Sequence, residues 1–406
     1  MKVAVLGYGT VGSGVVEVIS RNSEAISKKA GEPIELKYIL DIRDFDDDPM
    51  KEFIVKDFNT ILEDDEVGVI AEAMGGIEPA YTFVKSALSR GKSVATSNKE
   101  LVAMHGPELL QVAKENGASF LFEASVGGGI PIIRPLQEAL TGDEVCEITG
   151  ILNGTTNFIL TEMKEKGRSF EEVLKEAQDL GYAERNPEAD VEGYDACRKI
   201  AILASLAFGR TVDYKDVPTE GITKITTQDM FYAEQIGHSI KLLGSCKRTE
   251  EGVSASVEPV MVSLMHPLGP VRDVFNAIVV TGNMVDDVMF YGKGAGKLPT
   301  ASAVVADMVQ ATKQKNNPVV YEWSREKEEL VAKEAVKARY FVRLEGDLSC
   351  VEPLIKEIFG EVTLLEPFSK QDCAFITSVD KRGKLLEKVE KLGEKVTVLN
   401  KIAMQK

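Results

Sequence analysis

Two lysines in this 406-residue sequence are placed where they could assist chemistry at a carbonyl group. Lys99 follows an apolar run that ends at Thr96, and Lys199 lies four residues after Asp195 in a helical pattern. A lysine beside a substrate carbonyl can donate a hydrogen bond or a proton. Residues four apart share a helix face, however, so Asp195 and Lys199 could equally form a surface ion pair worth about 0.3–0.5 kcal/mol. From these residues alone a structural role is favoured for the pair, and a surface position for Lys99.

The segment before Lys199 is acidic and loop-like. If Lys199 transfers a proton, Glu184 and Asp195 could hold the cationic amine of a substrate. Asp190 is expected to cap the N-terminus of the helix that carries Lys199, and Gly209 is expected just beyond its C-terminus.

Gly7, Gly9 and Gly12 form a GxGxxG motif that follows an apolar run and opens an apolar-faced helix. In this context Gly7 permits a tight turn, Gly9 lets the backbone approach a pyrophosphate, and Gly12 lets the helix pack on the strand. The helix N-terminus then offers N–H groups to the phosphates. The alternative is a glycine turn that binds nothing, but the context favours a dinucleotide site.

Asp41 and Arg43, at the end of the second apolar run, bear on the choice of dinucleotide. Asp41 at the strand end would bind the ribose hydroxyls of NAD, whereas Arg43 would accommodate the 2′-phosphate of NADP. Arg43 is also compatible with an ordinary solvated surface charge. The sequence favours NADP(H), with NAD(H) as the alternative.

The segment from Glu123 to Pro131 could bind a cation. Its three consecutive glycines leave carbonyl oxygens exposed, and Glu123 adds a carboxylate. Such oxygen ligands suit a hard monovalent cation better than a transition metal. A simple turn between two domains is equally compatible with these residues.

The hydrophobic patterns show which elements must position these side chains. In the first 125 residues, short apolar runs alternate with helical patterns, as is typical of a doubly wound parallel α/β sheet. Ligands bind at the carboxyl ends of such strands, where Gly75 and Lys99 would lie. The expected strands are Val3–Leu6, Glu35–Asp41, Val67–Ala73, Ser93–Thr96 and Ser119–Glu123.

The middle of the chain follows a different pattern. Helical patterns at 170–180 and 195–208 are followed by consecutive strand-like runs separated by turn residues, which predicts an α+β domain with an antiparallel sheet. Its expected strands are 150–152, 241–247, 253–262, 277–281 and 287–291, and a helix is expected at 298–312.

The last part of the chain predicts a separate domain. Residues 338–406 read strand, helix, strand, strand, helix, strand, and this βαββαβ order is typical of ferredoxin-like domains. The whole chain is then expected to have a dinucleotide-binding domain at 1–130, to which 293–318 return, an α+β domain at 131–292, a charged linker at 319–337 and the ferredoxin-like domain at 338–406.

Composition disfavours several classes of partner and site. The net charge of −16 repels nucleic acids and anionic lipids. The five scattered cysteines and three histidines form no zinc pattern and indicate a reduced intracellular protein. No run approaches the roughly 20 apolar residues of a membrane span, and the glycine-broken start does not fit a secretory signal. The protein is expected in the cytoplasm.

Seven segments, taken together and in order, resemble homoserine dehydrogenases. The block at 150–204 is the most specific, because other Rossmann enzymes do not carry it. The segments are GYGTVGSGV at 7–15, EAMGGIEPAY at 72–81, TSNKELVAMHG at 96–106, EASVGGGIPII at 123–133, GILNGTTNFIL at 150–160, AQDLGYAERNPEADVEGYDACRKIAILA at 177–204 and GKGAGKLPTASAVVAD at 292–307.

The resemblance implies an activity and a set of site residues. The family interconverts L-homoserine and L-aspartate 4-semialdehyde reversibly with NAD(P), in threonine and methionine biosynthesis. By resemblance, Lys199 is the proton donor and acceptor, and Lys99 is a second active-site lysine that contacts cofactor and substrate. Glu184 and Asp195 bind homoserine. The implied cofactor-binding residues are Gly7, Tyr8, Gly9, Thr10, Val11, Gly12, Arg43, Gly75, Lys99, Gly181, Gly294 and Gly296, and the implied sodium-binding residues are Glu123, Val126, Gly128 and Ile130.

The resemblance also bears on assembly and regulation. It implies a homodimer built on the antiparallel sheet, or a higher homo-oligomer, and the C-terminal domain resembles a degenerate ACT domain. Such domains often bind amino acids, but the first turn here, Asp347 to Cys350, lacks the usual glycine. Threonine inhibition and a purely structural role are both compatible with this turn.

Three alternative functions remain for the whole chain. They are an aspartate-semialdehyde dehydrogenase, a broader Gfo-type sugar oxidoreductase and a non-catalytic sensor of NADPH and an amino acid.

Overall fold

The computed structural model describes residues 1–405 and divides into two compact units. The first unit comprises residues 1–144, 201–214 and 290–328. The second unit comprises residues 145–200, 215–289 and those from 329 onward.

A six-stranded parallel sheet forms the core of the first unit. Its order is β3-β2-β1-β4-β5-β6, which confirms the predicted doubly wound sheet. The order changes direction between β1 and β4, so a crevice for a ligand is expected at the carboxyl ends of these two strands. The bounds are β1 Lys2–Leu6, β2 Glu35–Leu40, β3 Ile54–Val55, β4 Val67–Glu72, β5 Ser93–Thr96 and β6 Phe120–Leu121.

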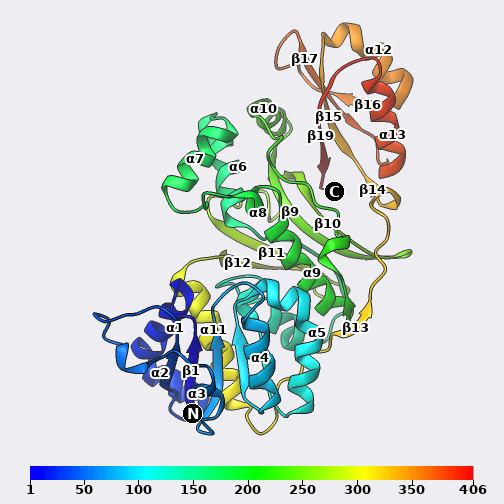
Figure 1. The fold of residues 1–406 in the computed structure, drawn as a ribbon. Helices are drawn as coiled ribbons and strands as arrows, with labels where there is room; N and C mark the ends of the chain where they lie inside the picture. Colours follow the sequence, from blue (N-terminus) through cyan, green and yellow to red (C-terminus); the bar gives the residue numbers. More distant parts are fainter. Residues whose placement is uncertain (406) are drawn as a thin grey trace. The chain divides into compact units, whose positions relative to one another are not determined.

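Helices cover both faces of this sheet. On one face α1 (Thr10–Arg21) and α2 (Ser23–Ala30) pack with α11 (Lys297–Lys313), which comes from far along the chain (Figure 1). Gly14 makes this approach possible, because a Cβ there would lie 2.8 Å from the Lys297 carbonyl oxygen. Helices α4 (Ala80–Ser89) and α5 (Lys99–Glu115) pack together and contact β4, β5 and β6, and the short α3 spans Asn59–Leu62.

The first part of the predicted linker is packed rather than loose. Tyr321 and Trp323 are buried, and both rings contact Phe122 edge-on. The Trp323 ring lies over Gly106, where a Cβ would approach to 2.7 Å, and its indole nitrogen donates to Thr211 at 3.1 Å. Beyond it, β13 (Ser324–Lys327) pairs in parallel with β8 (Arg210–Thr211). Two aromatic anchors therefore fix a segment whose composition is mostly charged.

A nine-stranded mixed sheet organises the second unit, in the order β12-β11-β7-β9-β10-β19-β15-β17-β16. The predicted antiparallel pairing is confirmed from β11 through β7 and β9 to β10. Residues of these four strands, among them Thr149, Ser245 and Thr281, line an open groove of about 690 Å³. The bounds are β7 Val145–Ile151, β9 His238–Thr249, β10 Gly252–Ser263, β11 Phe275–Gly282 and β12 Asp286–Lys293.

Helices pack on the other face of these strands. Helix α6 (Gly154–Lys166) contacts β9, β11, α7 (Phe170–Asp179) and α10 (Thr227–Gln235). The prediction that Asp190 caps the Lys199 helix is wrong, because Asp190 lies inside the short α8 (Glu188–Val191) and α9 begins later (Tyr194–Phe208). Gly209 follows α9 with a φ of 78°, as expected.

The C-terminal segment has the predicted βαββαβ order. Its strands lie in the order β19-β15-β17-β16, which is the ferredoxin-like arrangement. β19 also pairs in parallel with β10, so this sheet continues that of the preceding strands. The bounds are β15 Tyr340–Glu345, α12 Leu348–Phe359, β16 Val362–Leu364, β17 Asp372–Thr377, α13 Arg382–Gly393 and β19 Val398–Met404, with two-residue strands β14 Lys337–Ala338 and β18 Asp380–Lys381 pairing separately.

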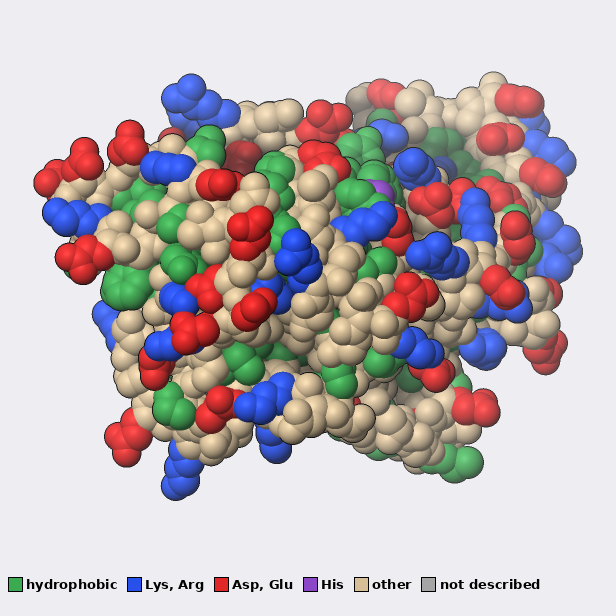
Figure 2. All heavy atoms as spheres, turned by 60° about the horizontal axis from the view of Figure 1, so that its bottom comes forward, with side chains coloured by type: hydrophobic (Ala, Val, Ile, Leu, Met, Phe, Trp, Pro, Cys, Tyr) green, Lys and Arg blue, Asp and Glu red, His purple; other side chains and the backbone are tan. Residues whose placement is uncertain are grey.

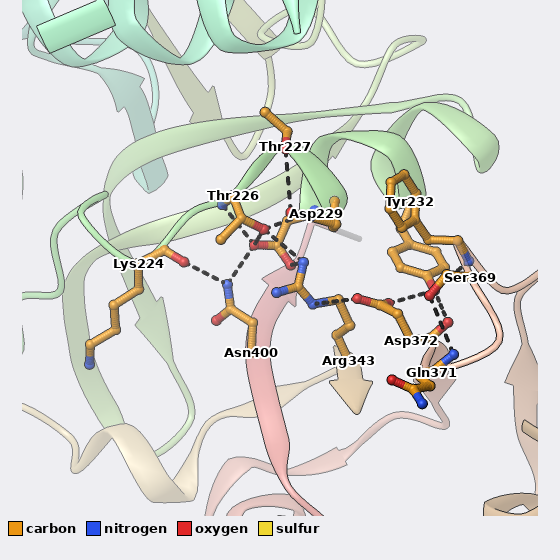
Figure 3. A network of polar contacts seen from close by, with 12 residues as sticks. Lys224, Thr226, Thr227, Asp229, Tyr232, Arg343, Ser369, Gln371, Asp372 and Asn400 are labelled. Carbon is orange, nitrogen blue, oxygen red and sulfur yellow. Dashed lines mark hydrogen bonds and ion pairs between the residues drawn. The ribbon is translucent and has the colours of Figure 1, made fainter. Parts of the chain in front are cut away.

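A buried polar network, which we name the Arg343 network, joins α10 to the C-terminal strands (Figure 3). Arg343 of β15 donates to Thr226 at 2.7 Å and pairs with Asp229 at 3.2 Å. Asn400 of β19 donates to the same Asp229 carboxylate at 2.9 Å. Tyr232 of α10 donates to the Asp372 carboxylate at 2.9 Å. The network therefore fastens α10 to three strands, β15, β17 and β19.

Charges of both signs are dispersed over the surface. On the face shown in Figure 2, acidic and basic side chains are interspersed rather than gathered into a broad patch of one sign. Among residues 1–405, no helix is both long enough and apolar enough to cross a bilayer.

Candidate active site

The glycine loop of the first unit has the geometry expected of a pyrophosphate site. Gly7 has a φ of 90°, and a Cβ there would lie 2.9 Å from the Ala73 carbonyl oxygen. A Cβ on Gly12 would lie 1.8 Å from the Gly7 carbonyl oxygen, whereas a Cβ on Gly9 would meet nothing within 4 Å. Helix α1 begins at Thr10 without a side-chain cap, so its first N–H groups are not used by a capping side chain. Phosphate oxygens are the ligands that such a helix N-terminus prefers.

Asp41 and Arg43 form one ion pair at the end of β2. Arg43 donates to both Asp41 oxygens, from Nε at 3.0 Å and from Nη2 at 2.8 Å, and the Tyr8 backbone N–H donates to the same carboxylate at 2.8 Å. The Arg43 hydrogen bonds hold the pKa of Asp41 well below its usual range. The carboxylate is buried, whereas 58% of the Arg43 side chain is exposed. Of the two charged groups at this strand end, the Arg43 guanidinium is therefore the one that faces solvent.

Glu72 organises the loops that follow β4 and β5. Its buried carboxylate accepts hydrogen bonds from the Met74 N–H at 2.8 Å and from the Thr96 hydroxyl. Burial raises the pKa of Glu72. Asn98 caps α5 and donates to the Gly76 carbonyl, and Lys99 follows as the first residue of that helix, half-buried. The structure thus gathers the loops that contain Gly7, Gly75 and Lys99 at the carboxyl ends of neighbouring strands.

The proposed cation loop is closely held. The Glu123 carboxylate accepts from the backbone N–H groups of Ile132, Ile133 and Arg134 at 2.6, 2.7 and 2.8 Å. This carboxylate therefore fixes the loop that follows it. Gly128 has a φ of 57°, and a Cβ on it would lie 2.2 Å from the Gly294 carbonyl oxygen. Gly128 therefore packs against the backbone of Gly294, and Gly296 is the residue before α11.

A buried ion pair lies in the second unit. Lys199 donates to Asp195 at 2.7 Å and to the Leu152 carbonyl at 2.8 Å. Both charged side chains are buried, with Asp195 4% and Lys199 8% exposed. The interpretation as a surface ion pair is therefore wrong. A buried pair costs desolvation, which is unusual without a role in structure or chemistry.

Asn153, which the sequence patterns did not single out, joins two carboxylates near this pair. Its side-chain amide donates to Asp190 at 2.7 Å and to Asp195 at 2.9 Å. The signal that could have found it is its position two residues after a buried strand, which is comparable with that of Asp41 directly after β2 and of Lys99 three residues after β5. Asp190 belongs to this cluster rather than to a helix cap.

Glu184 and Gly181 lie on the exposed loop between α7 and α8. Gly181 has a φ of 76°, and the Glu184 carbonyl accepts from the Gln178 side chain at 3.0 Å. Thr155 donates to the Tyr182 carbonyl at 2.7 Å, which ties this loop to the start of α6 beside Asn153. Among residues 1–405, no group of three or more His, Cys, Asp or Glu side chains is arranged to hold a metal ion.

Comparisons with known proteins agree on one family. A family model described as homoserine dehydrogenase matches residues 131–309, and the model of the NAD-binding domain of homoserine dehydrogenase matches residues 7–123. The homoserine dehydrogenase of Bacillus subtilis is 45% identical over 317 residues, which are 77% of this chain and 73% of that protein.

Solved structures agree in fold. The crystal structure of a homoserine dehydrogenase from Thiobacillus denitrificans has a TM-score of 0.92 at 35% identity and covers 100% of this chain and 98% of that chain. A hyperthermophilic archaeal homoserine dehydrogenase mutant in complex with NADPH has a TM-score of 0.65 at 30% identity, covering 77% of this chain and 97% of that chain. The chain therefore belongs to the homoserine dehydrogenase family, and it is an NAD(P)-dependent oxidoreductase of amino-acid biosynthesis.

Proposed function

We propose that Lys199 moves the proton in the reaction of this family, the reversible conversion of L-homoserine into L-aspartate 4-semialdehyde. The observation that carries this proposal is the buried Lys199–Asp195 pair, with its 2.7 Å contact. Buried charge pairs that serve no reaction are often replaceable by apolar side chains, whereas a proton donor must keep its ammonium group.

The roles of the chain's residues follow from charge. In aldehyde reduction, the Lys199 ammonium gives its proton to the carbonyl oxygen that becomes the hydroxyl, and in alcohol oxidation it takes that proton back. Asp195 and Glu184 supply negative charge for the substrate amine, and Lys99 is proposed to contact both substrate and cofactor. The bound nicotinamide supplies or accepts the hydride.

NADP(H) is proposed as the preferred cofactor. Because Asp41 is already bonded to Arg43 and Tyr8, its carboxylate is less available to ribose hydroxyls, while the exposed guanidinium can accept a 2′-phosphate. The NADPH bound in the archaeal relative agrees with this preference. The loop residues around Gly7 and those at Gly75, Gly181, Gly294 and Gly296 are proposed to complete the cofactor site.

Replacing Arg43 with Ala should shift the preference from NADP toward NAD. The kcat/KM with NADP is expected to fall about 10–100-fold, as for loss of one charged hydrogen bond, and that with NAD is expected to rise because Asp41 becomes available. Steady-state kinetics with both cofactors measure the shift, and Arg21→Ala on α1 serves as the control. An equal loss with both cofactors would contradict the assignment of Arg43.

A sodium ion is proposed to bind the loop that begins at Glu123. Within residues 1–405, the carbonyl oxygens of Val126, Gly128 and Ile130 receive no hydrogen bond, although all three residues are buried. Carbonyl oxygens of this kind suit a hard monovalent cation. Since the Glu123 carboxylate is engaged by three N–H groups, the carbonyls are proposed as the main ligands.

Three further assignments belong to this proposal. The C-terminal domain is proposed to be ACT-like, on the ferredoxin-like order of its strands. The chain is proposed to form a homodimer through the groove face of the sheet, which includes Thr149 and Thr281. The predicted domain division is retained, with dinucleotide binding at 1–130 and 293–318, catalysis at 131–292, the linker at 319–337 and the ACT-like domain at 338–406.

The proposal is tested by the absorbance of reduced nicotinamide. Wild type and Lys199→Ala are compared with L-homoserine and NADP or NAD at alkaline pH. Wild type is expected to turn over, and Lys199→Ala is expected to lose roughly two or more orders of magnitude in kcat while remaining folded. Retained turnover in Lys199→Ala would exclude the assigned role. A folded wild type that binds NADPH without turnover would instead support the sensor alternative.

A further inference from the structure

The side chain of Asn153 makes all the hydrogen bonds that it can. Its oxygen caps a helix, and its N–H groups bind the carboxylates beside Lys199. Its Oδ1 accepts from the backbone N–H of Thr156 at 2.9 Å and from the Thr156 hydroxyl at 3.0 Å. Its Nδ2 donates to Asp190 at 2.7 Å and to Asp195 at 2.9 Å. Two acceptor positions and two N–H bonds are all that an amide side chain offers.

These contacts fix the orientation of the amide. A rotation by 180° would turn its oxygen toward two carboxylates and its N–H groups toward the N–H of Thr156. Both changes are repulsive, and burial makes an unsatisfied polar group costly. The cap on α6 therefore determines that Nδ2 points at Asp195. Asn153 is 6% exposed, so water does not readily replace these contacts.

The Asp195 oxygen that Asn153 contacts is the one that contacts Lys199. Oδ2 of Asp195 accepts from Nδ2 of Asn153 and from Nζ of Lys199. Lys199 also donates to the carbonyl of Leu152, the residue before Asn153. The two consecutive residues that follow β7 thus hold both members of the pair, one through a side chain and one through the backbone.

We propose that Asn153 is a positioning residue for the reaction, which sets the orientation of Asp195 and thereby the direction and charge of the Lys199 ammonium group. The inference rests on the proposed role of Lys199. Asn153 supplies neutral donors at a point where two carboxylates meet, so it reduces their repulsion without competing with Lys199 for the proton.

Two substitutions separate this role from that of a cap. Asn153→Ser and Asn153→Asp both keep an oxygen that caps a helix well, and both lose the amide donors. In Asn153→Ser, kcat for aldehyde reduction is expected to fall about 10–100-fold, as for a misplaced catalytic group, with the KM for NADPH within about twofold of wild type.

The second variant changes the pH profile of kcat, which a purely structural role of Asn153 would leave unchanged. Asn153→Asp places a third carboxylate beside Asp195, and this charge keeps the Lys199 proton bound to higher pH. The alkaline limb of the pH profile of kcat for aldehyde reduction should therefore move to higher pH in Asn153→Asp but not in Asn153→Ser. Wild-type kcat and pH profile in both variants would show that Asn153 is only a cap and would overturn the proposal.

Controls address folding and the underlying mechanism. Ser169→Ala removes the cap of α7 and should lower the melting temperature without changing kcat or its pH profile. If neither Asn153 variant folds, Asp190→Ala leaves the cap of α6 in place, removes one acceptor of the Asn153 amide and should still lower kcat, whereas wild-type kcat would count against the proposal. If Lys199→Ala retains activity, the proposed function fails. If Lys199→Ala loses activity while the Asn153 variants keep it, only the positioning role fails.

Discussion

Lys199 and Lys241 are both buried lysines, but different groups satisfy them. Lys199 contacts a carboxylate, whereas Lys241 on β9 donates to two neutral oxygens, that of the Asn157 side chain at 3.0 Å and that of the Val271 carbonyl. Burial, together with the nearby cations Lys164 and Arg272, lowers the pKa of Lys241 to about 7. A lysine held in this way links strands and loops without needing to stay charged.

The low pKa of Lys241 makes stability depend on pH. Its folded value of about 7 lies below the unfolded value of roughly 10.4, so between these values the unfolded chain binds more protons. The free energy of unfolding is therefore expected to rise with pH above 7, by up to about 1.4 kcal/mol per pH unit relative to Lys241→Met. Urea unfolding at pH 7, 8 and 9 measures the difference. Lys247→Met, which removes an exposed lysine of the same strand, should leave the pH dependence of the free energy of unfolding as in wild type. An equal change in both variants would show that the burial of Lys241 is not the cause.

At the residue scale, the sequence identified candidate site residues but not the contacts that these residues make in the folded chain. Lys199 and Asp195 were identified as a possible pair, but their burial depends on packing that spacing alone does not reveal. Asn153 was missed because an amide neither titrates nor acts as a nucleophile. Its role depends on contacts with Asp190 and Asp195, which lie about 40 residues away in sequence and are brought beside it only by folding.

At the scale of elements, periodicity located the amphipathic helix α7 but missed α6, which has no polar face. Helix α7 has a capping box and an amphipathic pattern, and it was predicted nearly in full. Helix α6 buries residues all round, including Thr156, Phe158 and Leu160, so its sequence carries no periodic signal. Since Asn153 caps α6, missing the helix also concealed the residue that starts it.

The Arg343 network gives a prediction at this scale. Arg343→Met leaves the fully buried Asp229 carboxylate without its cation, which is expected to cost about 3–5 kcal/mol of stability. Adding Asp229→Asn removes the stranded charge and should restore part of the loss. Calorimetric melting of both variants measures this coupling, and a double variant less stable than the single one would show that the ion pair is not what fastens α10 to β15.

At the scale of the whole molecule, each unit is completed by residues distant in sequence. In the first unit, α11 packs on α1, and the buried Trp323 lies over Gly106. In the second unit, β19 pairs with β10 and brings apolar residues such as Ile402 and Ala403 to the sheet. The sequence predicted the order of these elements correctly, but a pattern of local runs carries no information about which distant strand becomes a neighbour.

The pairing of β19 with β10 has a consequence for biosynthesis. The ribosome must add the 135 residues between Ser263 and Val398 before the partner of β10 exists, which takes roughly 7–27 s at ordinary elongation rates. During that time the emerging polypeptide presents an unpaired strand edge beside apolar surface, which is the kind of segment that aggregates or recruits chaperones. The nascent chain is thus most vulnerable in the last third of its translation, and slowing the ribosome after Ser263 should lower the yield of folded enzyme more than slowing it before β9.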